Sequence, residues 1–135
     1  MNVVKIPFVK LLDINLTDTL ELKFKKELTN HLGSMHAGAL YTLAETQSGL
    51  FLQEHFKEYK NALPILRSGE IKYKKEAKGA VSAIAKADKK SLEKFENTLN
   101  KRAKALISVE VELYSNNELI ATAKFSCFVK ILNLK

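Results

Sequence analysis

The sequence is poor in cysteine and in the local features that mark several classes of protein. Cys127 is the single cysteine among 135 residues, so the chain forms no internal disulfide and offers no cysteine cluster for zinc. We therefore expect a reducing, cytoplasmic setting and no bound metal. Glycine-rich phosphate loops, internal repeats and linker-like segments are also missing, which predicts a single domain over residues 1–135.

Long hydrophobic runs are missing too. The stretch from Met1 to Leu12 is interrupted by Lys5, Pro7 and Lys10, so it lacks the continuous apolar core of a signal peptide or a membrane span. We expect the protein to remain where it is made, without crossing a membrane.

Negative charge is in short supply, since 15 acidic residues face 22 lysines and arginines and leave a net charge of +7. This surplus favours an anionic partner. Nucleic acid is disfavoured as that partner, because the chain has no tryptophan, only 8% aromatic residues, and no basic strand interleaved with aromatics. A phosphorylated group such as coenzyme A would use the same surplus.

Alternation of apolar and polar residues predicts five strands around one long helix. Parallel crossovers would need more helices, so the sheet should be antiparallel and wrapped around that helix, with a short polar helix inserted near its middle. Asparagines in the turn before the last strand tolerate positive φ and predict a hairpin there. The expected strands are residues 17–26, 65 to about 75, 80–87, 105–115 and 119–131, and the inserted helix is 88–102.

The long helix is predicted from about Gly38 to Tyr59, with Ser34 as a candidate cap. Apolar and small residues lie nearly all round it, so Glu45, about two turns inside, should be poorly solvated. A carboxylate in such a place needs a partner or a raised pKa, and a raised pKa is what a general base needs. The competing interpretation is a partly exposed helix residue paired to a lysine.

At this point a family resemblance becomes specific. Asn30, then His36-Ala37-Gly38 at the helix start, then Glu45 eight residues after Ala37, resemble the signature of hotdog-fold acyl-CoA thioesterases of the phenylacetate-pathway and 4-hydroxybenzoyl-CoA type. That signature is an Asn or Gln, His-Gly-Gly and a carboxylate. The resemblance implies an α+β hotdog fold, with an antiparallel sheet of five to six strands wrapped around one central helix.

The resemblance also implies roles for individual residues. Glu45 would be the catalytic carboxylate, Asn30 would orient water or the thioester, and His36 would stand beside the helix start. Ala37 replaces the first glycine of the signature; its backbone N–H would serve as oxyanion donor, with Gly38 beside it. We further assign substrate-binding positions to Gly33, Met35, Ser68 and Gly69. Coenzyme A would be part of the substrate and not a separate cofactor.

Two rival functions remain open. His31 lies 14 residues before Glu45, the separation seen in hotdog-fold dehydratases that act on hydroxyacyl thioesters, although residues 32–44 lack the proline-rich stretch of those enzymes. The chain could also bind acyl-CoA without catalysis. His36 could be a structural hydrogen-bonding residue instead of a proton carrier.

An oligomer is expected on general grounds. One sheet around one helix leaves an edge strand unpaired, and dimerisation removes that liability. We therefore expect a homodimer or homotetramer of this chain.

Overall fold

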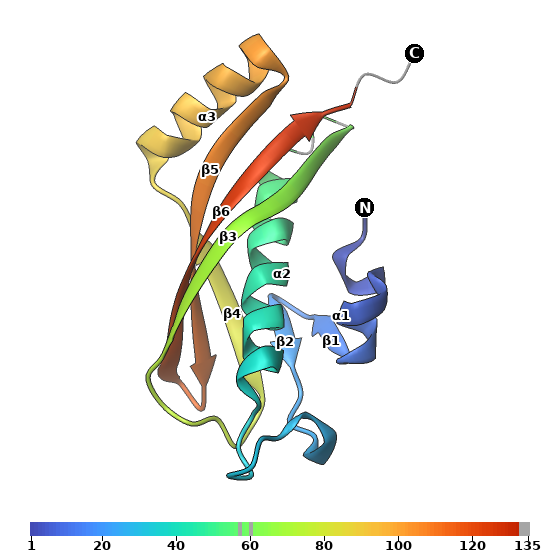
Figure 1. The fold of residues 1–135 in the computed structure, drawn as a ribbon, viewed down its shortest axis with the longest axis vertical. Helices are drawn as coiled ribbons and strands as arrows, with labels where there is room; N and C mark the ends of the chain where they lie inside the picture. The colour runs from blue at the N-terminus through green and yellow to red at the C-terminus, as the bar shows by residue number, and fades with distance from the viewer. Residues whose placement is uncertain (57, 60, 133–135) are drawn as a thin grey trace.

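The computed structural model describes residues 1–56, 58–59 and 61–132 as one sheet with a long helix against it (Figure 1). Three helices and two short 3-10 turns accompany six strands. In chain order the elements are η1 (Val3–Lys5), α1 (Pro7–Leu11), β1 (Ile14–Leu16), β2 (Leu20–Leu22), η2 (Lys26–Leu28), α2 (Ala37–His55), β3 (Ala62–Tyr73), β4 (Val81–Lys86), α3 (Lys89–Arg102), β5 (Lys104–Ser115) and β6 (Glu118–Ile131).

The sheet is antiparallel throughout, with strand order β1-β2-β4-β5-β6-β3. Its longest pairing is the β5–β6 hairpin, whose turn residues Asn116 and Asn117 both have positive φ (52° and 63°), as predicted. The sheet curls around α2, so its concave face meets the helix and its convex face is open (Figure 1). The predicted α+β architecture of five to six strands around one helix is confirmed.

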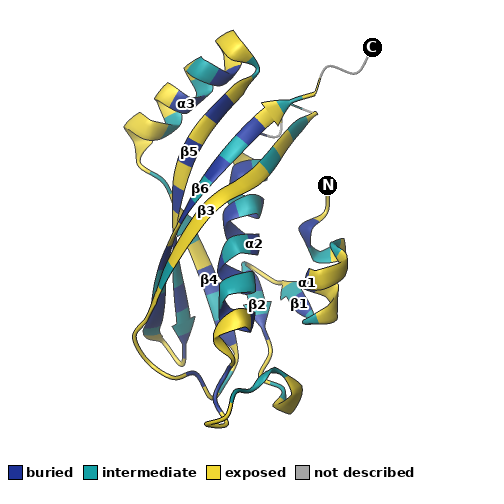
Figure 2. Ribbon diagram, in the orientation of Figure 1, coloured by how far each residue is buried: buried dark blue, intermediate teal, exposed yellow. Residues whose placement is uncertain are grey.

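The core lies between α2 and the concave face of the sheet. Leu43 and Ala44 of α2 and Val109, Leu113 and Phe125 of the sheet have no measurable exposure. Burial alternates along β5 because successive side chains of a strand point to opposite faces. The visible side of α2 carries buried, intermediate and exposed residues (Figure 2), and the N-terminal segment packs against the helix through η1 and α1. Functional groups on that side of the helix can therefore reach a ligand.

The first predicted strand, residues 17–26, is wrong in extent. Only β2 (Leu20–Leu22) of that range is a strand. It pairs with β1, which precedes the range, across a turn in which Thr17 N–H donates to the Thr19 carbonyl (2.9 Å). The alternation that indicated one strand continues through Phe24, but Phe24 is exposed and lies outside the sheet. Alternation alone does not show where a strand turns back.

The long helix is confirmed, but both of its ends differ from the prediction. Its N-cap is His36 and not Ser34. Met35, which lies between these two residues, forms a β-bridge with Thr29, so the helix begins only after it. The helix ends at His55, with Phe56 as its C-cap, instead of at Tyr59. Residue 57, within the end of the predicted helix, and residue 60, just after it, lie outside the described residues.

Strand β3 carries a bulge just before Ser68 and Gly69. Its register against β6 shifts between Leu66 and Ser68, which leaves Arg67 as the extra residue of a bulge. After the bulge Gly69 faces α2, where a Cβ atom would lie 2.9 Å from Phe125 Cδ1 and would overlap Tyr41 Oη. Glycine is therefore required at this position so that the helix can approach the strand closely.

The edges of the sheet are unequal. β1 is three residues long, whereas β3 is a twelve-residue strand with one side unpaired within the described residues. Leu63, Ile65 and Leu66 on β3 are exposed.

No helix in the described ranges has the length and apolar character that crossing a membrane requires.

Candidate functional site

The start of α2 has one free backbone donor. His36 is the N-cap, and its ring Nδ1 accepts from Gly38 N–H (2.8 Å). The next two N–H groups, of Ala39 and Leu40, donate to the His36 carbonyl. Ala37 N–H donates no hydrogen bond within the described residues, and Ala37 is exposed. The free N–H lies at the positive end of a 19-residue helix, where it can stabilise a developing negative charge.

The loop before the helix is held by Asn30. Its Oδ1 accepts from Leu32 N–H (2.9 Å) and Ser34 N–H (3.2 Å), and its Nδ2 donates to Ser34 Oγ (3.1 Å). Ser34 is buried by these contacts, and Gly33 takes the positive φ (76°) that the tight turn needs. Most of the hydrogen-bonding capacity of Asn30 is thus used inside its own loop, which positions the start of α2.

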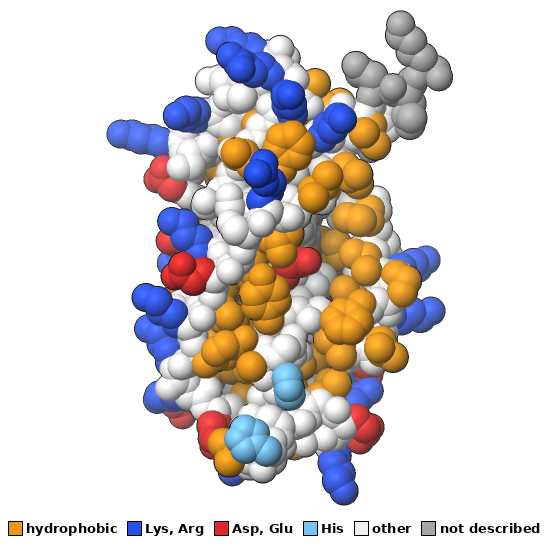
Figure 3. All heavy atoms as spheres, in the orientation of Figure 1, with side chains coloured by type: hydrophobic (Ala, Val, Ile, Leu, Met, Phe, Trp, Pro, Cys, Tyr) orange, Lys and Arg blue, Asp and Glu red, His pale blue; other side chains and the backbone are white. Residues whose placement is uncertain are grey.

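Glu45 lies two turns further along α2, in a hollow of about 240 Å³. We call this the Glu45 hollow: α2 forms its floor, the N-terminal segment forms one wall, and Pro64, Leu66 and Cys127 form the other. Within the described residues, no hydrogen bond or ion pair engages the Glu45 carboxylate. Figure 3 shows an acidic side chain in the hollow of this face, bordered by hydrophobic side chains.

Burial raises the pKa of the Glu45 carboxyl, and no neighbouring cation offsets this effect. The interpretation of Glu45 as a lysine-paired surface residue therefore does not fit the structure. The nearby hydroxyls do not stabilise its charge either. Thr46 donates to the Thr42 carbonyl (2.6 Å) and Ser48 to the Glu45 carbonyl (2.6 Å). A half-buried carboxylate without a partner is costly to the fold and is typical of a functional site.

The raised pKa makes a prediction about stability. Between the ordinary carboxyl pKa and the raised one, the folded state binds more protons than the unfolded state, so stability falls as pH rises through this window. Glu45→Gln removes the penalty, and we expect its thermal midpoint to exceed that of the wild type at pH 8 and to match it at pH 3. Circular dichroism melts would measure this. Glu54→Gln, on the exposed face of the same helix, is the control and should show no such gain.

The free N–H and the carboxylate open into different hollows. Ala37 lines a second one of about 370 Å³, the Ala37 hollow, together with Asn30, Met35, Tyr73, Lys74 and Lys75. Ala37 and Glu45 are eight residues apart, about 12 Å along the helix axis. Tyr41 lies between them on the same helix face, packed edge-on against Phe125 with ring centroids 5.5 Å apart.

The remaining predicted site residues are dispersed. Met35 is buried and lines the Ala37 hollow, whereas Gly33 is exposed in its turn and lines neither hollow. Gly69 faces α2, but Ser68 pairs in register with Ser126 on the convex face of the sheet, away from Glu45. His31 is exposed and lines neither the Glu45 hollow nor the Ala37 hollow.

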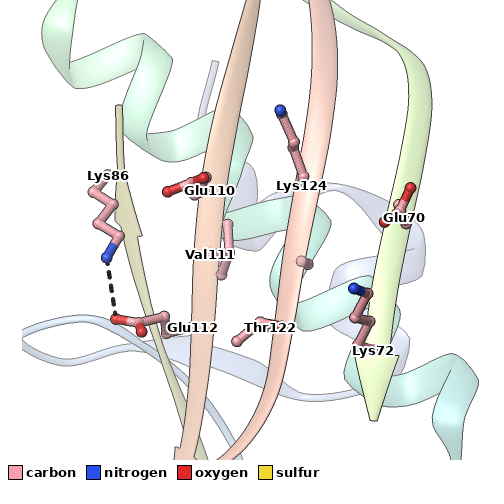
Figure 4. A pocket seen from close by; sticks show the side chains of 9 residues that line it. Glu70, Lys72, Lys86, Glu110, Val111, Glu112, Thr122 and Lys124 are labelled. Atoms are coloured by element: carbon pink, nitrogen blue, oxygen red, sulfur yellow. Dashed lines mark ion pairs between the residues drawn. The ribbon is translucent and has the colours of Figure 1, made fainter. Parts of the chain in front are cut away.

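The convex face carries a depression of a different kind (Figure 4). Acidic and basic side chains alternate across four strands, with Lys86 Nζ 3.8 Å from Glu112 Oε1 and with Lys124 in register with both Glu70 and Glu110. Each acid on this surface has a base beside it, so no net charge is left for a ligand. We place the functional site on the α2 side.

Two groups at the site had no signal in the sequence. Tyr73, at the end of β3, donates from its hydroxyl to the Ala37 carbonyl (2.9 Å) and so anchors the first residue of α2 to the sheet edge. The N-terminal segment covers the Glu45 hollow, with Gln53 Nε2 donating to the Met1 carbonyl (2.6 Å). Both are contacts between distant parts of the chain.

No group of three or more His, Cys, Asp or Glu side chains suited to a metal lies within the described part of the chain.

Comparison with known proteins places this arrangement in context. A family profile described as "Domain of unknown function (DUF4442)" matches residues 5–129. No curated protein matches the sequence significantly. Among solved structures, a Pseudomonas aeruginosa protein of unknown function described as a probable thioesterase is 27% identical, with a TM-score of 0.76 over 95% of this chain and 90% of that one.

Two more distant structures show the same fold. A Bacillus halodurans protein solved with CoA is 21% identical, with a TM-score of 0.70 over 88% of this chain and 75% of that one. A mutant of the phenylacetic acid degradation protein PaaI from Thermus thermophilus is 18% identical, with a TM-score of 0.69 over 90% and 97%. The fold is therefore the hotdog fold of the thioesterases, as the residue pattern implied.

Proposed function

The chain belongs to the DUF4442 family, and on that premise we propose that it hydrolyses an acyl-CoA thioester with Glu45 as its catalytic carboxylate. The observation that carries the proposal is the half-buried Glu45 carboxylate, which has no partner among the described residues and has a raised pKa. The free Ala37 N–H at the helix start supplies the second group that thioester hydrolysis needs. The names and the bound CoA of the similar structures support the substrate class.

The chemistry follows from these two groups. The thioester carbonyl oxygen accepts from Ala37 N–H, and the carboxylate of Glu45 removes a proton from water as the water oxygen attacks the carbonyl carbon. The oxyanion of the tetrahedral intermediate is stabilised at the helix start. When the C–S bond breaks, the thiolate of coenzyme A takes up the proton and the fatty or aromatic acid leaves. Direct attack by the carboxylate, followed by hydrolysis of the anhydride, uses the same two groups.

A single chain does not bring the two groups together. The attacking atom must approach the carbonyl carbon to about 3–3.5 Å while the carbonyl oxygen lies about 3 Å from Ala37 N. Glu45 of the same chain is two turns away, with Tyr41 between. We therefore assign each site to two chains, with Ala37 from one and Glu45 from its partner. Asn30, His36 and Tyr73 act as positioning residues for the helix start.

The unpaired edge of β3 is the surface we propose for the pairing. Two copies related by a twofold axis would join β3 to β3 and continue the sheet, which satisfies the open backbone groups of a twelve-residue edge. The exposed Leu63 and Ile65 of the edge strand would then lie beside residues of the partner strand.

The dimer is tested by placing charge on that edge. We expect the wild type to sediment as a dimer at micromolar concentration. Leu63→Lys/Ile65→Lys should dissociate it, because like charges brought together at an interface cost several kcal/mol. Ile84→Lys/Leu106→Lys is the matched control, since it places two lysines at exposed apolar positions of inner strands. A wild-type monomer with full activity would contradict the two-chain site.

Coenzyme A would reach the site from the side of the Ala37 hollow, where Lys74 and Lys75 lie. Lys75 pairs with Glu118 (2.6 Å), whereas Lys74 takes part in no ion pair found among the described residues. We expect Lys74→Glu to weaken CoA binding up to about tenfold at low salt and less at high salt, because surface attraction is screened. Calorimetry at two ionic strengths would measure this. Lys94→Glu, on α3, is the control; equal losses in both variants would refute a specific role for Lys74.

The direct test of the proposal is a panel of acyl-CoA and aryl-CoA thioesters with release of free thiol monitored. Hydrolysis of at least one thioester supports the thioesterase. Hydration of an enoyl thioester that depends on both His31 and Glu45 would instead support the dehydratase. Binding without either reaction would identify a non-catalytic acyl-CoA-binding protein.

A further inference from the structure

Most of the side chains that line the Glu45 hollow are apolar. Apart from Glu45, the helix hydroxyls, Gly49 and Cys127, it consists of apolar side chains: Met1, Val3, Ile6, Phe8 and Val9 from the N-terminal segment and Pro64 and Leu66 from β3. The hydroxyl hydrogens of Thr42 and Thr46 are engaged by helix carbonyls (2.9 and 2.6 Å), as is that of Ser48. Among the described side chains that line the hollow, the weakly donating thiol of Cys127 is the one donor not engaged by a helix carbonyl. The hollow therefore suits hydrocarbon.

Beside the hollow lies a second space, of about 220 Å³. Its lining is mostly apolar and includes two polar side chains: Leu52, Phe56, Ala62 and Val129, with Gln53 and Tyr59. Met1 and Pro64 line both spaces and so stand at the boundary between them. The hydrogen bond from Gln53 to the Met1 carbonyl and the burial of Val3 and Val9 fix the segment that carries this boundary.

We propose that the Glu45 hollow binds a medium-chain aliphatic acyl group, and that the N-terminal segment from Met1 to Val9 sets the length of that chain. This inference rests on the proposed function and names its substrate class. The boundary sets the length: a chain that fills the hollow of about 240 Å³ ends where Met1 and Pro64 stand. A longer chain must pass between Met1 and Pro64.

Gly49 offers a way to fill the hollow without disturbing the fold. It lines the hollow in the middle of α2, and a Cβ atom built on it meets no other atom within 4 Å. Glycine is a poor helix former, so a leucine there does not weaken the helix. Gly49→Leu would occupy the acyl space directly. Asn97→Leu, at an exposed position of α3, is the matched control.

Cys127 provides a reporter that does not depend on catalysis. It is the chain's single cysteine, it lines the hollow, and its side chain is buried with 3% exposure. Because Cys127 lines the hollow, we expect a small thiol reagent to approach it from there, so a chain bound in the hollow should slow its modification. The probes are S-methyl-CoA, S-octyl-CoA and S-benzyl-CoA, thioethers that cannot be hydrolysed.

The expected result is that S-octyl-CoA slows methanethiosulfonate labelling of Cys127 at least tenfold, as followed by mass spectrometry, while S-methyl-CoA and S-benzyl-CoA do not. Gly49→Leu should abolish the protection and Asn97→Leu should keep it. If the protein is a thioesterase, kcat/KM should rise about fourfold per added methylene until the chain reaches the boundary at Met1 and Pro64, and then level off.

Different results would contradict the thioesterase proposal and the acyl-chain proposal. Equal protection by the methyl and octyl probes, or by the benzyl and octyl probes, would overturn the medium-chain assignment even if thioesters are hydrolysed. Protection by S-octyl-CoA alone, with no hydrolysis of any thioester, would uphold the assignment and remove the thioesterase.

Discussion

Glu45→Gln is expected to lower the rate of thiol release about 10²–10⁴-fold while leaving acyl-CoA binding in place, because it removes the base and keeps the size of the side chain. The structure provides the reason: Glu45 is the carboxylate of its hollow, and its raised pKa follows from burial. Release of free thiol, measured with a chromogenic reagent under saturating substrate, gives the rate. Calorimetry with CoA gives the binding.

The control for this prediction lies on the same helix. Glu54 is exposed two to three turns further along, so Glu54→Gln changes the same net charge without touching the hollow. Its rate should equal that of the wild type. The wild-type rate should also fall as pH is lowered through the raised pKa of Glu45. If Glu45→Gln retained more than about a tenth of the activity, Glu45 would not be the base.

The second large effect is a recovery of activity on mixing two inactive variants. Ala37→Pro removes the proposed oxyanion donor without breaking the helix. Ala37 is the first helical residue, where proline is well tolerated. His36 already has the extended backbone (φ −63°, ψ 137°) that precedes a proline. Loss of an oxyanion donor should cost about 10²–10³-fold in kcat. Ala37→Gly keeps the N–H and should remain active.

Mixed dimers of Glu45→Gln and Ala37→Pro chains then decide how a site is assembled. If each site takes Ala37 from one chain and Glu45 from the other, a mixed dimer has one intact and one doubly defective site. Its activity should be about half that of the wild type. If both groups come from the same chain, every site carries a defect and no activity returns. Differently tagged, co-expressed chains allow the mixed dimer to be purified and assayed.

Much of the fold is predictable from local sequence. Alternating apolar residues predicted the β5–β6 hairpin, and paired asparagines predicted its turn, because strand period and positive φ depend on neighbouring residues only. The buried α2 helix followed from apolar residues all round its wheel. Glu45 stood out for the same reason, as a charge on a helix that should have no solvated face. Its position was therefore predictable, while its role remains a proposal.

What sequence alone could not determine depends on contacts between distant segments. The choice of His36 over Ser34 as the helix cap depends on the Thr29–Met35 bridge. The short extent of β2 depends on its pairing with β1 and β4. Tyr73 meets Ala37, and the N-terminal segment closes over Glu45, only because the sheet curls around α2. The amino-acid pattern thus determined which elements form and where the unusual charge lies. Tertiary packing decided which hollow that charge faces, because a hollow is formed by side chains from segments far apart in the chain.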